Sequence, residues 1–318
     1  MRTGNSSDSR TIEGIAGRSE AAETEMSDAM GEPHRKTPAS NKRFLVFLDF
    51  DGTIAEGGVL LSGPKKAIAA AQDQGHLVFL NTGRSFREVP KEAWDAGFDG
   101  HVTSAGAFAC VGEEIVHADT LLESDTERTV DVLDRRGLDF FLQYFDHMFA
   151  TRRMEKRLDD LYSRGAYPVR PSHVVHKIST KNVARVVFAP PDGSGLRGGR
   201  LTEDLKRELG DGLRFHPGVL PGRGVSSGEI SAASTSKASP FPALTHRFGV
   251  SPARVMAVGD EVNDLEMLRV AGLGVAMGDS PADVKEVADQ VTSGSVERGV
   301  AETFLRNGLI APDFRKAI

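Results

Sequence analysis

The chain has 318 residues and a formal net charge of −6, with 39% hydrophobic and 26% charged residues. These values are typical of a globular protein with room for two domains, and the acidic balance argues against nucleic acid as the main partner. No apolar run in the sequence approaches the length of a membrane-spanning helix. The single cysteine, Cys110, excludes an intrachain disulfide and favours a reducing, cytoplasmic location.

Residues 1–42 differ in composition from the rest of the chain. They are rich in Ser, Gly, Thr and acidic residues and hold almost no large apolar side chains. Such a segment cannot bury enough surface to offset the entropy of ordering, so we expect a disordered N-terminal tail.

The first predicted element is a strand that ends in two acidic residues. The apolar run that starts at Phe44 leads directly into Asp49-Phe50-Asp51-Gly52-Thr53. A run of this length is typical of a buried parallel strand, which delivers its last residues to the edge of the sheet where open α/β folds bind ligands. Side chains alternate along a strand, so Asp49 and Asp51 are expected on the same side, and Gly52 permits a sharp turn after them.

The elements that follow alternate between helix and strand. We expect a helix from Gly63-Pro64 to Gln74 and a strand at 76–80 that ends in Asn81-Thr82-Gly83-Arg84. A helix at 86–96, a strand at 101–103 and a hairpin over 107–117 come next. This order predicts the start of a parallel sheet.

The middle of the chain, residues 119–226, has a different pattern and is predicted to be an inserted α+β domain. Helices are expected at 122–136, 152–164 and 201–210, and strands at 139–145, 174–179, 183–189 and 213–216. The sheet pattern then resumes with a short strand at Glu229-Ile230, helices at 240–248, 281–288 and 296–306, strands at 254–258 and 272–278, and a helix that ends near Ala271. The fold class is therefore α/β, with a Rossmann-like parallel-sheet core formed by residues 43–118 and 227–318.

Polar residues follow several strands of this core, and they are expected to converge at one edge of the sheet. They are Asp49, Asp51, Thr82, Lys237, Asp260, Asn263 and Asp264. Several carboxylates at one place require a cation, and a set of oxygen ligands without Cys or His favours Mg²⁺ over zinc. A lysine, a threonine hydroxyl and the backbone N–H groups around Gly83 suit a phosphate group.

Four motifs resemble those of the haloacid dehalogenase (HAD) superfamily of phosphatases. Asp49-Phe50-Asp51-Gly52-Thr53 resembles the first, Asn81-Thr82-Gly83-Arg84 the second, Lys237 the third and Gly259-Asp260-Glu261-Val262-Asn263-Asp264 the fourth. The continuation from Met267 to Gly278 is similar to the Cof-type branch of the superfamily. The resemblance implies a HAD core with an inserted cap domain, and it covers about residues 43–118 and 227–318.

The resemblance also implies a role for each motif residue. Asp49 would be the nucleophile that forms an aspartyl-phosphate, and Asp51 would protonate the leaving oxygen and then activate water. Mg²⁺ would be held by the Asp49 carboxylate, the Asp51 backbone carbonyl and Asp260, with Asp264 in support. Thr82, Gly83, Lys237 and Asn263 would bind or neutralise the phosphoryl group of a small phosphorylated substrate, such as a sugar phosphate.

One segment departs from the pattern of the branch, and two other functions stay open. Ser104-Ala105-Gly106-Ala107 stands where the branch usually has Asn-Gly-Ala. A phosphohexomutase that resembles phosphomannomutase shares the double-Asp motif, and a bisphosphate-activated isomerisation assay would identify it. A phosphometabolite-binding protein without turnover is the other alternative, and hydrolysis of p-nitrophenyl phosphate would exclude it.

Overall fold

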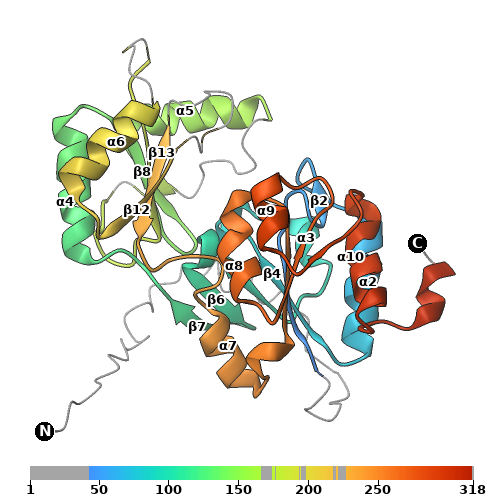
Figure 1. The fold of residues 1–318 in the computed structure, drawn as a ribbon. Helices are drawn as coiled ribbons and strands as arrows, with labels where there is room; N and C mark the ends of the chain where they lie inside the picture. The colour runs from blue at the N-terminus through green and yellow to red at the C-terminus, as the bar shows by residue number, and fades with distance from the viewer. Residues whose placement is uncertain are drawn as a thin grey trace, which may run out of the picture.

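The computed structural model describes residues 43–165, 174–175, 177–192, 194, 198–217, 220 and 227–316. The tail expected over residues 1–42 lies outside this part of the chain. The described residues form an eight-stranded sheet, a six-stranded sheet and a two-stranded hairpin (Figure 1).

The eight-stranded sheet has the order β16-β15-β14-β1-β4-β5-β6-β7. Its strands are β1 (Leu45–Leu48), β4 (Leu77–Asn81), β5 (Gly100–Thr103), β6 (Phe108–Val111), β7 (Glu114–Ala118), β14 (Val255–Gly259), β15 (Leu273–Ala276) and β16 (Gln290–Val291). Neighbours from β16 to β5 are parallel, whereas β6 and β7 form an antiparallel hairpin at one edge. The predicted parallel sheet and the predicted hairpin over 107–117 are both confirmed.

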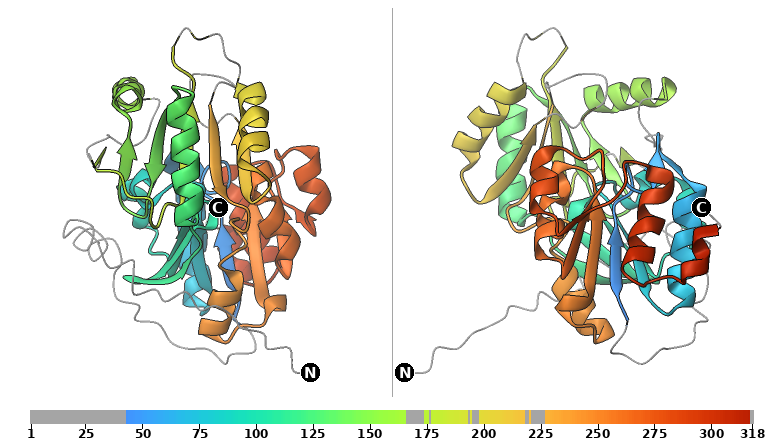
Figure 2. Two further views of the ribbon diagram at one scale, coloured as in Figure 1. Left: turned by 90° about the vertical axis from the view of Figure 1, so that its left-hand side faces the viewer. Right: turned by 45° about the vertical axis from the view of Figure 1, so that its right-hand side comes forward.

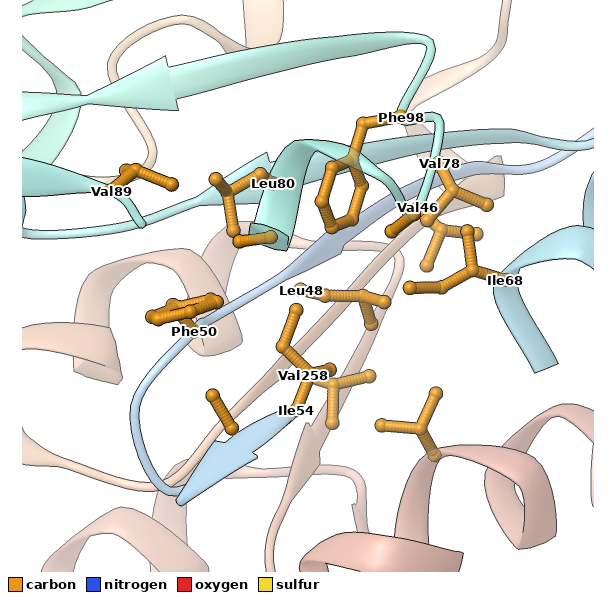
Figure 3. Packing of buried hydrophobic residues seen from close by; sticks show 14 of the residues in the cluster. Val46, Leu48, Phe50, Ile54, Ile68, Val78, Leu80, Val89, Phe98 and Val258 are labelled. Atoms are coloured by element: carbon orange, nitrogen blue, oxygen red, sulfur yellow. The ribbon is translucent and has the colours of Figure 1, made fainter. Parts of the chain in front are cut away.

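Alternate residues of β1 enter two separate hydrophobic cores, one on each face of the sheet. Val46 and Leu48 pack against the helices α2 (Ser62–Asp73), α3 (Lys91–Trp94) and α10 (Val296–Arg306). Leu45 and Phe47 pack against α7 (Phe241–Phe248), α8 (Leu265–Val270) and α9 (Ala282–Val287). Figure 3 shows Leu48 in the first core, close to Ile54 and Val258. Burial on both faces explains why β1 is apolar at every position.

The register of the central strands brings their carboxyl ends to one level. Leu48 at the end of β1 lies between Val258 of β14 and Leu80 of β4. The residues that follow these three positions therefore leave the sheet at the same edge, which is the arrangement that the sequence predicted.

The six-stranded sheet has the order β10-β9-β8-β11-β13-β12 and is made by the middle of the chain. Its strands are β8 (Asp139–Gln143), β9 (Met148–Ala150), β10 (Val174–Val175), β11 (Arg185–Ala189), β12 (Leu213–Pro217) and β13 (Gly228–Ala232). The helices α4 (Glu123–Arg135) and α6 (Gly198–Leu209) cover one face, and α5 (Arg152–Ser163) covers part of the other (Figure 2). We call this the second sheet.

The strand expected at Glu229-Ile230 was assigned to the wrong sheet. Instead of resuming the parallel core, β13 lies in the second sheet between β11 and β12 and pairs antiparallel with both. Ile230 is fully buried in the core beneath α4 and α6, so packing decides its place where a short apolar pattern could not. We propose that the inserted domain ends after Ala232, and not at residue 226.

Other predicted elements differ in length. The helix expected over 86–96 is a 3₁₀ turn (Phe86–Glu88) followed by the short α3. Pro90 lacks an N–H group and keeps Val89 extended, which prevents one continuous helix. The strand expected over 174–179 is only Val174–Val175, and the three-residue β9 and the hairpin of β2 (Ala55–Glu56) and β3 (Val59–Leu60) were not predicted.

Candidate active site

Asp49 lies immediately after β1 with its side chain almost fully buried. Its backbone N–H donates to the carbonyl of Val258 at 3.0 Å, so the pairing of β1 with β14 continues through this residue. Gly52 then turns the chain with φ +80°, and a Cβ atom there would lie 2.1 Å from Oδ2 of Asp260. A residue without a side chain is therefore required for this loop to pass beside Asp260.

Lys237 connects two of the acidic residues. Its Nζ donates to Oδ1 of Asp49 at 2.5 Å and to Oδ1 of Asp264 at 2.6 Å, and the side chain is fully buried. Burial alone lowers a lysine pKa, but the charges of Asp264 and Asp49 raise the pKa of Lys237 above its usual range. The side-chain amide of Asn81 donates to the backbone carbonyl of Lys237 at 2.9 Å, which fixes the segment that carries the ammonium group.

Asp49, Asp260 and Asp264 form an acidic cluster in which one oxygen of each lies within 4.8 Å of the others. Burial, followed by the charge of Asp264, raises the pKa of Asp260 to about 6, and burial also raises the pKa of Asp49. Thr53 donates to Oδ1 of Asp260 at 3.1 Å. Three carboxylates beside one ammonium group leave an excess of negative charge, which a divalent cation with oxygen ligands fits.

The two oxygens of Asp264 already have partners. Oδ1 accepts from Lys237, and Oδ2 accepts from the backbone N–H groups of Asp260 at 2.9 Å and of Glu261 at 3.1 Å. Asp264 therefore orients both Lys237 and the loop that carries Asp260.

Asp51, unlike Asp49, has a half-exposed side chain and is held by Arg84. The guanidinium donates from Nε to Oδ2 and from Nη2 to Oδ1 of Asp51, both at 2.7 Å. A two-bond fork of this kind fixes the plane of the carboxylate as well as its position. Arg84 belongs to the predicted second motif, but no sequence pattern assigned it to Asp51.

The remaining candidate residues lie around the same edge. Thr82 is buried after β4, and its hydroxyl accepts from the backbone N–H of Arg84 at 3.1 Å. Asn263 is exposed and lies next to Gly83. A Cβ atom added to Gly83 would be 3.6 Å from Nδ2 of Asn263. The structure thus brings Gly83 and Asn263 together, as expected for two sides of one binding site.

The segment that departs from the branch pattern has an unusual backbone. Ser104 and Ala105 are in the left-handed region, with φ 51° and 55°. Their N–H groups donate to the carbonyls of Arg84 at 2.7 Å and of Thr82 at 3.1 Å, which holds this conformation. A Cβ atom on Gly106 would lie 1.7 Å from the carbonyl oxygen of Ser236, so this glycine allows the loop to approach the segment before Lys237.

A cavity of about 200 Å³ lies between this edge and the second sheet. Arg214, His216, Glu229 and Ser231 line it from the second sheet, and Ser104, Lys237, Asn263 and Glu266 are among its residues on the other side. Arg214 spans the two sides through an ion pair with Glu266, whose N···O distance is 3.0 Å. Burial alone would raise the pKa of Glu266. The hydrogen bonds from Arg214 and Ser236 outweigh burial, so the pKa of Glu266 is lowered. None of the cavity residues of the second sheet was predicted, because their proximity depends on how the inserted domain is placed.

Comparisons with known proteins agree with this arrangement. A family model described as haloacid dehalogenase-like hydrolase matches residues 46–304. The chain is 26% identical over 269 residues to the 5-amino-6-(5-phospho-D-ribitylamino)uracil phosphatase YcsE of Bacillus subtilis, covering 81% of this chain and 93% of that protein. It is 28% identical over 274 residues to YitU of the same organism, also named a 5-amino-6-(5-phospho-D-ribitylamino)uracil phosphatase, covering 82% of this chain and 96% of that protein.

The solved structure of the HAD subclass IIB sugar phosphatase BT4131 has the same fold, with a TM-score of 0.68 at 22% identity over 84% of this chain and all of that one. Because the family model matches most of its length, the chain belongs to the haloacid dehalogenase-like hydrolases. The Cof-type resemblance and the α/β fold class are thereby confirmed. Among the helices of the described residues, none has the length and apolar character needed to cross a bilayer.

Proposed function

We propose that this enzyme is a Mg²⁺-dependent phosphomonoester hydrolase that acts on a small, sugar-phosphate-like metabolite through an aspartyl-phosphate. The observation that carries the proposal is the buried contact of Lys237 with both Asp49 and Asp264, beside Asp260. Such a group of charges has little structural purpose alone, since buried ions are costly to desolvate. It suits a site that receives a phosphate dianion and a divalent cation.

In the first half of the reaction, a carboxylate oxygen of Asp49 attacks phosphorus. The new oxygen–phosphorus bond forms as the bond to the leaving oxygen breaks, and Asp51 gives its proton to that oxygen. Lys237 holds one oxygen of Asp49 in place and offsets the charge of the phosphoryl group.

In the second half, water attacks the phosphorus of the aspartyl-phosphate. Asp51 takes a proton from this water, and the bond between phosphorus and Asp49 breaks to release phosphate and restore the carboxylate. Arg84 keeps the carboxylate of Asp51 in one orientation through both half-reactions.

The residues that would hold Mg²⁺ are Asp49 and Asp260, together with the backbone carbonyl of Asp51. When bound, the ion would neutralise negative charge on the phosphoryl oxygens. Both oxygens of Asp264 accept hydrogen bonds from the protein, so we assign Asp264 to positioning rather than to direct ligation.

The size and lining of the cavity support a small, polar leaving group. A volume of about 200 Å³ is below the usual range for drug-sized ligands, and its walls offer hydroxyl, carboxylate, imidazole and guanidinium groups. Hydrogen bonding by such side chains fits an alcohol with several hydroxyl groups. The relatives are named as phosphatases of a ribityl-bearing compound and of sugars, which agrees with this class of substrate.

The test is phosphate release from a panel of sugar and polyol phosphates, with Mg²⁺ and with EDTA. Asp49→Asn should abolish release, because the amide removes the nucleophile and a metal ligand while filling the same volume. Asp131→Asn, on the exposed face of α4, is the matched control and should retain full activity. Substantial turnover by Asp49→Asn, after contaminating phosphatases are excluded, would overturn the proposal.

A further inference from the structure

Glu88 is a buried carboxylate that the proposed chemistry does not use. It lies at the end of the 3₁₀ turn that follows Arg84 and is 5% exposed. One oxygen, Oε2, accepts from the backbone N–H of Ser85 at 2.7 Å, and the same oxygen accepts from Gln143 at 3.0 Å and from Arg185 at 3.3 Å. Ser85 belongs to the same turn, whereas Gln143 and Arg185 lie opposite each other on β8 and β11 of the second sheet. Glu88 therefore joins the second sheet to the turn after Arg84, at the edge of the eight-stranded sheet that carries the candidate active site.

Glu88 also contacts Arg84, the residue that holds Asp51. Nη1 of Arg84 donates to the backbone carbonyl of Glu88 at 3.0 Å, while the other two donors of this guanidinium hold Asp51. The side chain of Glu88 thus fixes the turn whose carbonyl orients Arg84.

The contacts on the second sheet are charged and sheltered from water. Arg185 donates to Glu229 at 2.9 Å and to Gln143 at 2.5 Å, in addition to its bond with Glu88. Two carboxylates, one guanidinium and one amide then satisfy one another, and the side chains of Arg185, Glu88 and Glu229 are each no more than 13% exposed. A buried polar cluster of this kind is stable only when its members are in register, so displacement of the second sheet breaks it as a unit.

We propose that Glu88 is a positioning residue that couples the seating of the second sheet to the orientation of Arg84 and, through Arg84, of Asp51. The inference rests on the proposed function where it gives Asp51 the proton transfer. With the second sheet seated, Gln143 and Arg185 hold Glu88 and the turn is fixed. With the sheet displaced, the carboxylate loses the hydrogen bonds from Gln143 and Arg185, and the carbonyl that orients Arg84 loses the support that they give.

The kinetic test compares two substrates that differ in their need for a general acid. Glycerol 3-phosphate releases a poor leaving group that must be protonated, whereas p-nitrophenyl phosphate releases a good one. Glu88→Gln should lower kcat/KM for glycerol 3-phosphate at least about tenfold more than for p-nitrophenyl phosphate, in the same direction as Asp51→Asn. Arg87→Gln is the matched control, because Arg87 belongs to the same turn and joins it to the inserted domain through a hydrogen bond to the carbonyl of Asp146 at 3.2 Å. It should lower both values equally.

A second test, by hydrogen exchange, needs no substrate. Gln143→Met removes a donor on the second sheet and should speed exchange of the backbone amides from Ser85 to Glu88, although the altered residue lies in the inserted domain. Unchanged exchange in this turn, or equal losses of both substrates in Glu88→Gln, would overturn the coupling. A wild-type protein that hydrolyses neither substrate would overturn the proposed function instead, and the exchange result would still decide the coupling.

Discussion

Asp49 and Asp51 are separated by one residue and lie in opposite surroundings. Asp49 is buried against Lys237, whereas Asp51 is half exposed and forms an ion pair with Arg84. This contrast supports different tasks for two identical side chains, one as nucleophile and one in proton transfer.

Asp51→Asn should therefore reduce turnover without a matching loss of metal affinity. In the proposed mechanism the side chain of Asp51 supplies the proton, while its backbone carbonyl is the expected metal ligand, so we expect kcat to fall by about 10²–10⁴-fold. Calorimetric titration with Mg²⁺ checks the second part, with Asp260→Asn for comparison. If Asp51→Asn weakened Mg²⁺ binding as much as Asp260→Asn does, the division of roles would be wrong.

Gly52→Ala should damage the metal site as well as the stability of the fold. A methyl group at this position would overlap Oδ2 of Asp260, and φ +80° is unfavourable for alanine. Gly57→Ala is a matched control, because φ is +57° there but nothing lies within 4 Å of the added carbon. Urea denaturation should show a loss of about 1–2 kcal/mol for Gly57→Ala and a larger loss for Gly52→Ala. Weaker Mg²⁺ binding is expected for Gly52→Ala alone, and equal effects of the two variants would contradict the close approach.

The residues of the candidate site could be predicted where they follow a strand or belong to one of the four motifs. Asp49 and Asp260 each directly follow a strongly apolar run, Asp264 stands shortly after Asp260, and the structure places all three in one cluster. Arg84 and Thr53 stood inside the predicted motifs, but their partners Asp51 and Asp260 depend on side-chain directions that the motif does not specify. Glu88 carried no signal, because two of its donors, Gln143 and Arg185, come from strands of the second sheet.

At the scale of elements, long apolar patterns predicted the fold and short ones did not. The strands β1, β4 and β14 are apolar through most of their length and were predicted within a residue or two of their bounds. By contrast, β13 was assigned to the wrong sheet, since five residues of mixed polarity contain no information about which partner they will pair with. The register of β13 with β11 and β12 is a tertiary property.

From the sequence, hinging of the inserted domain is predicted at its two crossings to the core, near Asp119 and at Gly224 to Gly228, where glycine can absorb a backbone change. Gly224 lies outside the described residues, and Gly228 begins β13 within the second sheet. The two crossings between the domains instead meet at Asp119, whose carboxylate accepts from Ser234 and from Thr235, both at 3.0 Å. We propose that the domain moves about this contact.

Asp119→Ala should therefore loosen the connection without unfolding either domain. It removes two hydrogen bonds to a charged acceptor, which are partly exposed, so we expect a loss of about 1–3 kcal/mol in the free energy of unfolding. Hydrogen exchange should become faster at 119–121 and 233–235, and slower or unchanged exchange there would place the hinge elsewhere. Asp125→Ala, on the nearby α4, is a control for loss of a partly exposed carboxylate that pairs with Arg128.

At the scale of the whole molecule, the acidic cluster should make stability depend on both pH and Mg²⁺. The pKa of Asp260 is raised from 3.8 to about 6, so the folded metal-free protein keeps a proton that the unfolded chain releases between these values. Stability of the metal-free protein should then fall as the pH rises from about 4 through about 6. Because a bound cation takes the place of that proton, Mg²⁺ should raise Tm more at about pH 7.5 than at about pH 5.

Thermal unfolding at both pH values, with and without Mg²⁺, measures this effect. Asp260→Asn should reduce the difference between the two pH values, since the amide does not titrate, while Asp49, whose pKa burial also raises, keeps its own part. A Mg²⁺-induced rise in Tm that is the same at both pH values in the wild-type protein would show that the cation does not displace a proton from this cluster.

The contact between Lys237 and Asp49 joins residues 188 positions apart, and all of the second sheet lies between them in the chain. A ribosome makes Asp49 early, but its partner strand β14 and the other two carboxylates come only after the inserted domain. During synthesis, the inserted domain can fold before the core is complete. At that stage β1 can pair with β4, but its other edge has no partner because β14 has not been made. If the proposed function holds, catalytic competence therefore arrives late, because a nascent chain that ends before residue 260 carries the proposed nucleophile, Asp49, without Asp260 and Asp264 beside it.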